Sequence, residues 1–452
     1  MNQNEENHID LNKRTEGDIN FSAERAKWLK NDISEKAKTL LEKDARYFLH
    51  QSLSTPCLDV LQDSKGPFIQ SVSGKSYLDF HGNNVHQLGF SHPKLVARLT
   101  DQLQSLTFST RRYTNEIAIN FAEKLASLLP SDLNRTLLTP NGSSAIGIAL
   151  KLARAVTGKF KVVSFWDSFH GASLDAIGVG GEAVFREYMG PLMPGVERIP
   201  PPVTYRGIYE GNEQKCLEYL EYVFKKEGDI GAFLAETVRN TDVQIPSKSF
   251  WQDARALCDR YGVLLILDEI PIALGRTGKM FAFEHFEVEP DILCLGKGLG
   301  GGIFPQAAMV TRDSFNRFGD ISLGHYTHEK SPLGSLAGLT TIEIIEEEGL
   351  LSKAQNDEAF MREELHRLEQ KHQLIGDIRG KGLLWGIELV IDRNTKEKAV
   401  NEAEKIMYNC LKNGLSFKVS AGNVLQLAPA LTISRNELSR AIGIIDNAIQ
   451  EL

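Results

Sequence analysis

A single lysine at the end of a short apolar run is the residue best suited to chemistry in this sequence. Lys297 follows the run Asp291-Ile-Leu-Cys-Leu-Gly and precedes Gly-Leu-Gly-Gly-Gly302. The apolar residues predict a buried strand, and the glycines allow backbone and ligand to approach the amine closely. A lysine in this setting either binds phosphate as a point charge or forms a Schiff base with a carbonyl compound.

A carboxylate at the end of a second predicted strand favours the Schiff base. The stretch from Val263 is apolar as far as Asp268 and Glu269, which is typical of a parallel strand buried on both faces. Pyridoxal phosphate requires a lysine to hold it and an acid to keep its pyridine nitrogen protonated, so that the ring can accept electrons. Lys297 and Asp268 together therefore predict a site for this cofactor.

The elements that must position these two residues alternate along the chain, and this predicts a mainly parallel sheet with helices on both faces. The predicted strands are 135–139, 161–165, 231–236, 263–268 and 291–295, and the predicted helices between them are 143–157, 216–226 and 250–261. Ligands bind such α/β sheets at the carboxyl ends of the strands. We therefore expect Glu236, Asp268 and Lys297 to lie at one edge of the sheet.

The segments on either side of this sheet predict a smaller domain. Spacings of three and four predict a helix over 21–50, Ser73-Gly74 predicts a hairpin over 66–80, and further helices are predicted over 92–106 and 114–129. The last predicted elements are helices over 333–347 and 355–372, a short hairpin-like region and a helix from residue 435. We expect an N-terminal segment (1–95), a large domain (96–331) and a C-terminal small domain (332–452).

Composition excludes several classes of protein. The 452 residues carry a net charge of −8 and are 42% hydrophobic, so a large core is available and an overall basic surface for nucleic acid is not. The five scattered cysteines contain no CxxC pair, and we predict neither a metal site nor a disulfide framework. No apolar run approaches the about 18 residues that a membrane span needs, and no signal-peptide pattern opens the chain. These features favour a cytoplasmic protein.

Two loops after predicted strands could contact the cofactor. Gly142 and Ser143 stand where a strand passes into a helix. Either they cradle a phosphate at the helix N-terminus, or Ser143 simply caps the helix. Phe169-His170-Gly171 follows the strand 161–165, and Phe169 either stacks on a planar ring or belongs to the core.

Other polar residues leave alternatives open. Glu236 is either catalytic or structural, holding Arg276 or a nearby loop, and Ile270 would press an apolar face on the cofactor ring. Arg111 and Arg112 form either an anion clamp or a solvated charge pair. In the stretch 324–332, a phosphate contact from Thr327 is favoured over a metal site at the two histidines.

Taken together, these motifs resemble the class III pyridoxal-phosphate aminotransferases of fold type I, from about residue 66 to the end of the chain. The residues that carry the resemblance are Asn141-Gly-Ser-Ser-Ala145, Phe169-His-Gly171, Glu236-Thr-Val238, Asp268-Glu-Ile270, Gly275-Arg-Thr-Gly278 and Lys297. The resemblance implies an obligate homodimer with sites at the subunit interface, in which Thr327 reaches the phosphate of the neighbouring subunit's cofactor.

Two positions depart from the family pattern. The family commonly has glutamine where this chain has Pro271. The family's transaminating members also have a Leu-Arg-x-x-Pro-Pro-Leu segment, whose arginine holds the substrate carboxylate, and the corresponding residue here is Gln426. A neutral amide cannot replace a bidentate, charge-assisted clamp, which argues against keto acids as amino acceptors.

The missing arginine suits a lyase of the family. The local sequences of the stretches 79–87 and 326–332 most resemble a lyase that converts (R)-1-hydroxy-2-aminoethylphosphonate to phosphonoacetaldehyde and ammonia, as in phosphonate degradation. His86, Arg111 and Arg112 are candidates to hold the phosphonate of this substrate. The alternatives are an ω-aminotransferase that uses pyruvate or 2-oxoglutarate, a phospho-lyase for phosphoethanolamine-type substrates, and a non-catalytic binding or regulatory homologue.

Overall fold

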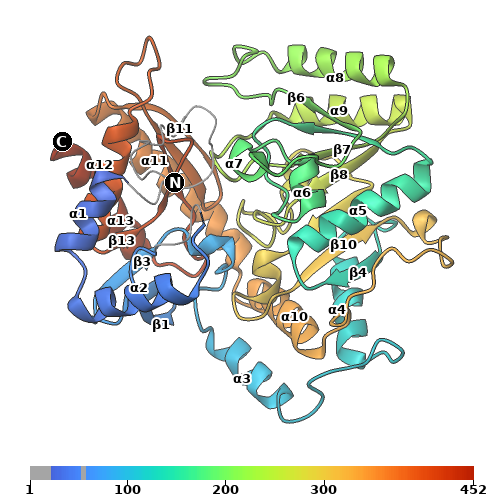
Figure 1. Cartoon of the computed structure of the whole chain (residues 1–452), viewed down its shortest axis with the longest axis horizontal. Coiled ribbons are helices and arrows are strands. Elements are labelled where there is room, and N and C mark those ends of the chain that lie inside the picture. The colour runs from blue at the N-terminus through green and yellow to red at the C-terminus, as the bar shows by residue number, and fades with distance from the viewer. Residues whose placement is uncertain (1–21, 52–56) are drawn as a thin grey trace.

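The computed structural model describes residues 22–51 and 57–452, and a seven-stranded sheet forms the centre of its larger part (Figure 1). In spatial order the strands are β4 (Arg135–Thr139), β10 (Ala307–Thr311), β9 (Ile292–Leu295), β8 (Leu264–Asp268), β7 (Ile230–Glu236), β5 (Lys161–Phe165) and β6 (Val196–Ile199). Only β10 runs antiparallel to its neighbours, so the predicted mainly parallel sheet is confirmed. β6 and β10 are strands that the sequence alone did not predict.

Helices cover both faces of this sheet. The helices of this larger part are α3 (Pro93–Gln102), α4 (Glu116–Ser127), α5 (Gly142–Thr157), α6 (Leu174–Val179), α7 (Ala183–Arg186), α8 (Glu213–Glu227), α9 (Lys248–Tyr261) and α10 (Pro332–Glu347). α4, α5, α6, α8 and α9 contact strands of the sheet, whereas α3 packs against α10 and α7 against α6. α5, α8 and α9 each end at a glycine with left-handed backbone (Gly158, Gly228 and Gly262), the residue that most easily adopts this helix-ending conformation. No helix within the described ranges has the length and apolar character that crossing a bilayer requires.

Two four-stranded sheets form the smaller part, on the left of Figure 1. One has the order β1 (Leu61–Lys65), β2 (Phe68–Ser71), β3 (Ser76–Asp79) and β13 (Leu415–Ser416), and the other the order β11 (Ile375–Lys381), β12 (Leu384–Leu389), β15 (Val424–Leu427) and β14 (Lys418–Ser420). Because β13 pairs with β3, segments from the two ends of the chain share a sheet. The predicted hairpin over 66–80 is confirmed as β2 and β3.

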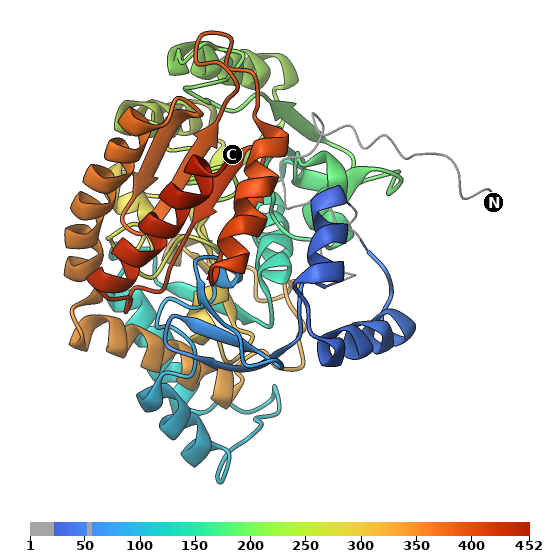
Figure 2. The same ribbon diagram turned by 90° about the vertical axis from the view of Figure 1, so that its left-hand side faces the viewer.

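Five helices complete the smaller part, and the C-terminal ones lie side by side in Figure 2. They are α1 (Ala23–Asn31), α2 (Glu35–Tyr47), α11 (Leu350–Lys371), α12 (Val400–Lys412) and α13 (Arg435–Gln450). The prediction of one helix over 21–50 was wrong, because Ser34 adopts extended backbone and caps a new helix by accepting a hydrogen bond from the Ala37 N–H at 3.2 Å. The first 21 residues of the predicted N-terminal segment lie outside the described residues, and the domain limits at 95 and 331 stay predictions.

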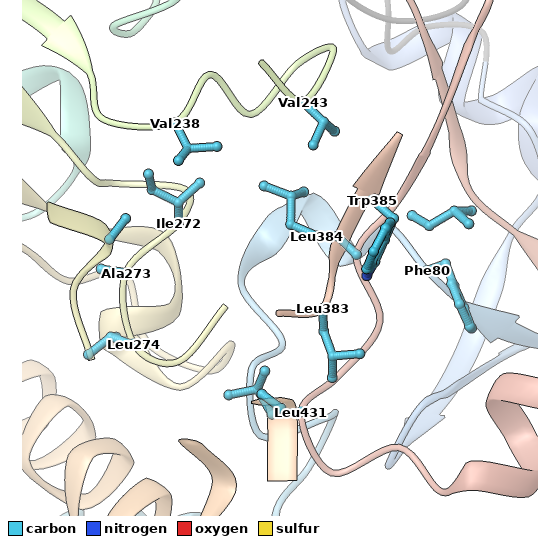
Figure 3. Close-up of a cluster of buried hydrophobic side chains, with 14 of the residues drawn as sticks. Phe80, Val238, Val243, Ile272, Ala273, Leu274, Leu383, Leu384, Trp385 and Leu431 are labelled. Carbon is cyan, nitrogen blue, oxygen red and sulfur yellow. The ribbon is translucent and has the colours of Figure 1, made fainter. Parts of the chain in front are cut away.

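The two parts meet in a buried apolar cluster. Figure 3 shows Val238, Val243 and Ile272 from loops of the large sheet opposite Leu384 and Trp385 from β12. The contact also includes a fully buried arginine, Arg276. Its side chain donates hydrogen bonds to the main-chain carbonyls of Leu383 and Pro429. Loops that leave the carboxyl ends of β7 and β8 are therefore fixed by the smaller part of the molecule.

The helix α10 supports the turn that carries Lys297. This turn is η4 (Lys297–Gly300), a short 3₁₀ helix directly after β9, and α10 packs against η4, α3 and α4. Gly338 of α10 allows a close approach to α4, since a Cβ atom at this position would lie 2.4 Å from Cζ of the buried Phe121 ring.

We expect the substitution Gly338→Ala to lower the free energy of unfolding by about 1–3 kcal/mol, because the added methyl group overpacks the α4–α10 contact. Gly443→Ala is the matched control: it lies within α13, where nothing would lie within 4 Å of the new Cβ atom. The control should raise stability by up to about 1 kcal/mol, because alanine favours helix more than glycine does. Denaturant unfolding of both variants measures this, and equal stability of the two would contradict the close contact.

Candidate active site

A cavity of about 280 Å³ lies at the carboxyl ends of β7, β8 and β9. Its walls are formed by Gly142, Ser143, Phe169, His170, Gly171, Ala172, Glu236, Asn240, Thr241, Asp268, Ile270, Pro271 and Lys297. Eight of the nine residues predicted to contact the cofactor therefore line one cavity, although they come from five separate segments of the chain. The place of the cavity agrees with the general position of ligands in open α/β sheets.

Lys297 presents its amine to this cavity from a strained turn. Its backbone has a φ of +46°, in the left-handed region, and the Gln87 side chain lies directly against the next residue, since a Cβ atom on Gly298 would lie 2.0 Å from Oε1 of Gln87. Burial lowers the pKa of Lys297, although the carboxylates of Asp268 and Glu236 act in the opposite direction. A lowered pKa increases the neutral fraction of the amine, which is the nucleophilic and basic form.

Asp268 is held in one orientation from two sides. The carboxylate is 1% exposed; its Oδ2 lies 2.8 Å from Nδ1 of His170, and its Oδ1 accepts a hydrogen bond of 3.0 Å from the Ile270 N–H. His170 is also buried, and its Nε2 has no hydrogen-bond partner among the described residues. Such a pair fixes the direction of the carboxylate at the bottom of the cavity, as a partner of a pyridine nitrogen requires.

The N-terminus of α5 forms another wall, and the predicted cap at Ser143 was wrong. Asn141, and not Ser143, caps the helix, since its side chain accepts a hydrogen bond from the Ser144 N–H at 2.9 Å. Ser143 is left to line the cavity, where its Oγ accepts from the Ala172 N–H at 3.3 Å. A Cβ atom on Gly171, which has a φ of +127°, would lie 2.2 Å from that oxygen, so this glycine keeps the cradle open.

Glu236 ties two wall segments together. Its Oε1 accepts from the Phe169 N–H at 3.3 Å and its Oε2 from the Asn240 N–H at 3.1 Å, and burial raises its pKa. Glu236 therefore holds a nearby loop, which was one of the two structural roles predicted for it. The other predicted role was to hold Arg276, and no hydrogen bond joins these two side chains within the described residues. Phe169 borders the cavity and also packs against Phe185, with ring centroids 4.6 Å apart.

These walls fit pyridoxal phosphate. Lys297 would hold the aldehyde carbon, Asp268 the pyridine nitrogen, and Gly142 and Ser143 the phosphate at the positive end of α5. Phe169 and Ile270 offer apolar surface to a ring. The unpartnered Nε2 of His170 is a buried polar atom at the cavity wall that would gain a partner from a ligand or from water.

Four predicted residues lie elsewhere. Thr327, Arg111 and Arg112 are exposed, and Arg111 lines a different cavity beside the loop that carries Thr327. His86 is fully buried and stacks on Phe90, and burial together with Arg276 lowers its pKa to about 3. A phosphonate cannot reach a fully buried imidazole, and a neutral imidazole offers it no positive charge. The position of His86 therefore does not suit a phosphonate ligand.

Three residues near the cavity were not singled out from the sequence. Asn240 and Thr241 line it directly, and their only sequence signal is that they closely follow Glu236 at a predicted strand end. His81 lies near Lys297: its own burial, followed by the charge of Lys297, lowers the His81 pKa to about 4. A neutral His81 can accept or donate a hydrogen bond without adding charge to the site.

The chain belongs to the class III aminotransferases, because the model of this family matches residues 50–449. The predicted family and fold type are confirmed, and the cofactor of the chain is pyridoxal phosphate. The matched region includes all the residues that line the cavity.

Individual relatives differ in their reactions. (R)-1-hydroxy-2-aminoethylphosphonate ammonia-lyase of Vibrio splendidus is 55% identical over 97% of this chain and 95% of that protein. Leucine/methionine racemase of Thermococcus litoralis is 33% identical over 91% and 95%. Among solved structures, an (S)-enantioselective omega-transaminase from Thermomicrobium roseum has a TM-score of 0.86 with 27% identity, and the match covers 92% of this chain and 98% of that one.

We expect Lys297→Ala to abolish covalent attachment of the cofactor, because no other amine lines the cavity in the described part of the chain. Reduction with borohydride followed by mass measurement of the denatured protein checks this: the parent protein and a Lys36→Ala control, altered at an exposed lysine of α2, should gain the mass of the reduced cofactor. Retention of that mass by Lys297→Ala would show that another amine carries the cofactor.

The neighbour of Asp268 gives a prediction about pH. Burial raises the pKa of Glu269 from 4.5 to about 7, although it accepts hydrogen bonds from Thr237 Oγ1, the Ala282 N–H and the Phe283 N–H. The folded state therefore binds this proton more tightly than the unfolded state. The stabilisation, on the order of 1–3 kcal/mol, is complete below about pH 4.5 and is lost as the pH rises through about 7.

Glu269→Gln removes this titration. The unfolding free energy of the parent minus that of the variant should become smaller from pH 5 to pH 8, because only the parent loses the stabilisation. Denaturant midpoints at these two pH values measure the change. Groups that titrate in both proteins cancel in the difference. The exposed Glu289→Gln is the control and should show no such change. A difference that is constant with pH would mean that Glu269 is ionised throughout.

Proposed function

We propose that this protein is a pyridoxal-phosphate-dependent ammonia-lyase that converts (R)-1-hydroxy-2-aminoethylphosphonate to phosphonoacetaldehyde and ammonia. The proposal is supported by the 55% identity, over nearly the full length of both chains, to the Vibrio splendidus enzyme with that substrate in its name. The family also contains racemases and transaminases, so the choice among these reactions must come from the site.

The observation that carries the proposal is the environment of Gln426. This residue stands on β15, at the position where the family resemblance implies a carboxylate-binding arginine in transaminating members. Here the side chain is 1% exposed, neutral and committed to a hydrogen bond of 2.6 Å from its Nε2 to the main-chain carbonyl of Asn240. A keto acid would find no cation at this position, whereas a lyase needs no keto acid.

The reaction balances without a second substrate. A proton leaves the carbon that bears nitrogen, and the hydroxyl group leaves the neighbouring carbon that bears phosphorus. The resulting enamine tautomerises and is hydrolysed, so that the water lost in the elimination is regained and ammonia is released. The phosphonate stays on the product, where it serves only as a group for recognition.

The cofactor, when bound, supplies an electron sink for the charge left by proton removal. Lys297 would hold the cofactor and, once released from it, move the proton at the nitrogen-bearing carbon, for which its lowered pKa is suited. Asp268 would keep the pyridine nitrogen protonated, and His170 would keep the Asp268 carboxylate in place. Protonation of the departing hydroxyl would also fall to Lys297.

The quaternary structure is part of the proposal. We infer a homodimer in which the exposed Thr327 reaches the cofactor phosphate of the partner subunit, as the family resemblance implies. Arg111 borders the same loop and would come to the interface with it, where it or Arg112 could bind the phosphonate. A native mass equal to the single chain of 50.3 kDa would contradict this.

A cytoplasmic location in a phosphonate-degrading organism is the setting we propose. The four buried cysteines, Cys216, Cys258, Cys294 and Cys410, are free thiols in the structure, and burial raises the pKa of Cys216 and Cys258 to about 12. Free thiols suit a reducing compartment.

Ammonia release without a keto acid tests the function. Purified protein loaded with pyridoxal phosphate is mixed with (R)-1-hydroxy-2-aminoethylphosphonate, and ammonia and aldehyde are measured over many turnovers. We expect continued release of both in equal amounts. Asp268→Asn should lower kcat by roughly 10³-fold or more, because the amide cannot stabilise a protonated pyridine nitrogen.

The competing activities differ in the substrates they need and in the products they release. A transaminase would stop after one turnover and resume only when pyruvate or 2-oxoglutarate is added. A phospho-lyase would release inorganic phosphate from phosphoethanolamine. Either result, with no continued ammonia release from the hydroxylated phosphonate, would overturn the proposal.

A further inference from the structure

The loop between β7 and α9 links the cavity to the smaller part of the molecule. Its base is closed by an antiparallel bridge between Arg239 and Gln244, and Nη1 of Arg239 lies 3.1 Å from Oδ1 of Asp242. Arg379 of β11 donates to the carbonyls of Asp242 and Val243 at 2.7 and 3.0 Å. This loop is therefore rigidly held, and side chains on it keep their places in the site.

Asn240 is fixed at both of its main-chain polar groups. Its N–H donates to Oε2 of Glu236 at 3.1 Å, and its carbonyl accepts from Nε2 of Gln426 at 2.6 Å. The first partner belongs to the cavity wall and the second to β15 on the other side of the domain contact. Since Nε2 of Gln426 must face a carbonyl oxygen, the orientation of this amide is settled by its partner.

The side-chain oxygen of Asn240 lacks a hydrogen-bond partner in the described part of the chain. Asn240 is 7% exposed and lines the cavity, and its Oδ1 makes no hydrogen bond within residues 22–51 and 57–452. A buried amide without a partner costs about 1–3 kcal/mol and is rare in folded proteins. An unpartnered amide at the wall of a ligand cavity gains its hydrogen bonds when a ligand with a matching group is bound.

The charges around Asn240 select the matching group. The carboxylates of Glu236 and Asp268 share the cavity with it, and Glu236 is bonded to its N–H. A phosphonate carries negative charge and accepts hydrogen bonds only, so it is disfavoured at Asn240, whose main chain bonds the Glu236 carboxyl group. A hydroxyl group is neutral and both donates and accepts, which matches the carbonyl and the NH₂ of an amide.

We propose that Asn240 binds the hydroxyl group of the substrate and that Gln426 positions Asn240 for this contact. The inference rests on the proposed function, and it assigns to this site the discrimination between hydroxylated and unhydroxylated aminoethylphosphonates. A substrate without the hydroxyl leaves the Asn240 amide unpaired, and a site built to bond a substrate hydroxyl discriminates against such analogues more strongly than an apolar pocket does.

The test compares two ligands that differ only in the hydroxyl group. For the loaded enzyme, kcat/KM is measured with (R)-1-hydroxy-2-aminoethylphosphonate, and 2-aminoethylphosphonate is used as a competitive inhibitor to give Ki. For Asn240→Ala we expect kcat/KM to fall roughly 10- to 100-fold, while Ki stays within about 2-fold, because only the hydroxylated ligand loses a contact. Asn240→Leu, which keeps the volume of the side chain, should give the same pattern if the alanine variant folds poorly.

Two controls separate binding from structure. Asn356→Ala changes an exposed asparagine of α11 and should alter neither value. If Ki in Asn240→Ala rises by the same factor as kcat/KM falls, Asn240 contacts a part common to both ligands, or supports the fold, and the proposal is overturned. If the parent enzyme itself releases no ammonia from the hydroxylated compound, the proposed function fails before this comparison is made.

The positioning role of Gln426 has its own readout. Gln426→Met removes the bond to the Asn240 carbonyl with little change in volume, and it should lower kcat/KM while leaving Ki for 2-aminoethylphosphonate within about 2-fold. In the double variant with Asn240→Ala we expect no further fall, because both changes remove one contact. Additive losses, or an equal change in Ki, would overturn the positioning role.

Discussion

The structure depends on keeping two functional groups, the Asp268 carboxylate and the Lys297 amine, in one cavity. A buried carboxylate is unstable unless it is hydrogen-bonded, and Asp268 obtains these bonds from His170 and from the main chain at Ile270. Both partners stand in loops at the carboxyl ends of parallel strands. The parallel order of β5, β7, β8 and β9 brings these loops to one edge and so places the two groups together.

The second constraint comes from the contact between the two parts of the molecule. Each part has its own sheets, yet the loop 237–244 takes hydrogen bonds from β11 and β15, and Arg276 donates to carbonyls on the other side. Backbone carbonyls accept hydrogen bonds from Arg276 and Gln426 here, whereas Arg379 also pairs with the carboxylates of Asp377 and Glu388. A substitution in the smaller part can therefore change the position of Asn240 in the cavity wall.

The same fold is used by racemases and transaminases as well as by the ammonia-lyase relative. The cofactor residues provide chemistry that these reactions share, and the walls around them decide which bond is broken. Gln426 is a neutral residue on β15, so it offers no positive charge to a carboxylate. Its Nε2 donates a hydrogen bond to the main-chain carbonyl of Asn240, which holds this residue in the wall.

The sequence by itself determined the main sheet and the Lys297–Asp268 pair, because buried parallel strands are continuous apolar runs and catalytic residues stand directly at their ends. It also located Ser143, Phe169 and Ile270, which follow strand ends in the same way. Only the tertiary structure decided which distant residues meet. Neutral Gln426 carries no sequence signal for its contact with Asn240, 186 positions away, and the burial of His86 follows from packing between segments far apart in the chain. Periodicity records which face of an element is buried, whereas the partner on that face is set by how the elements pack.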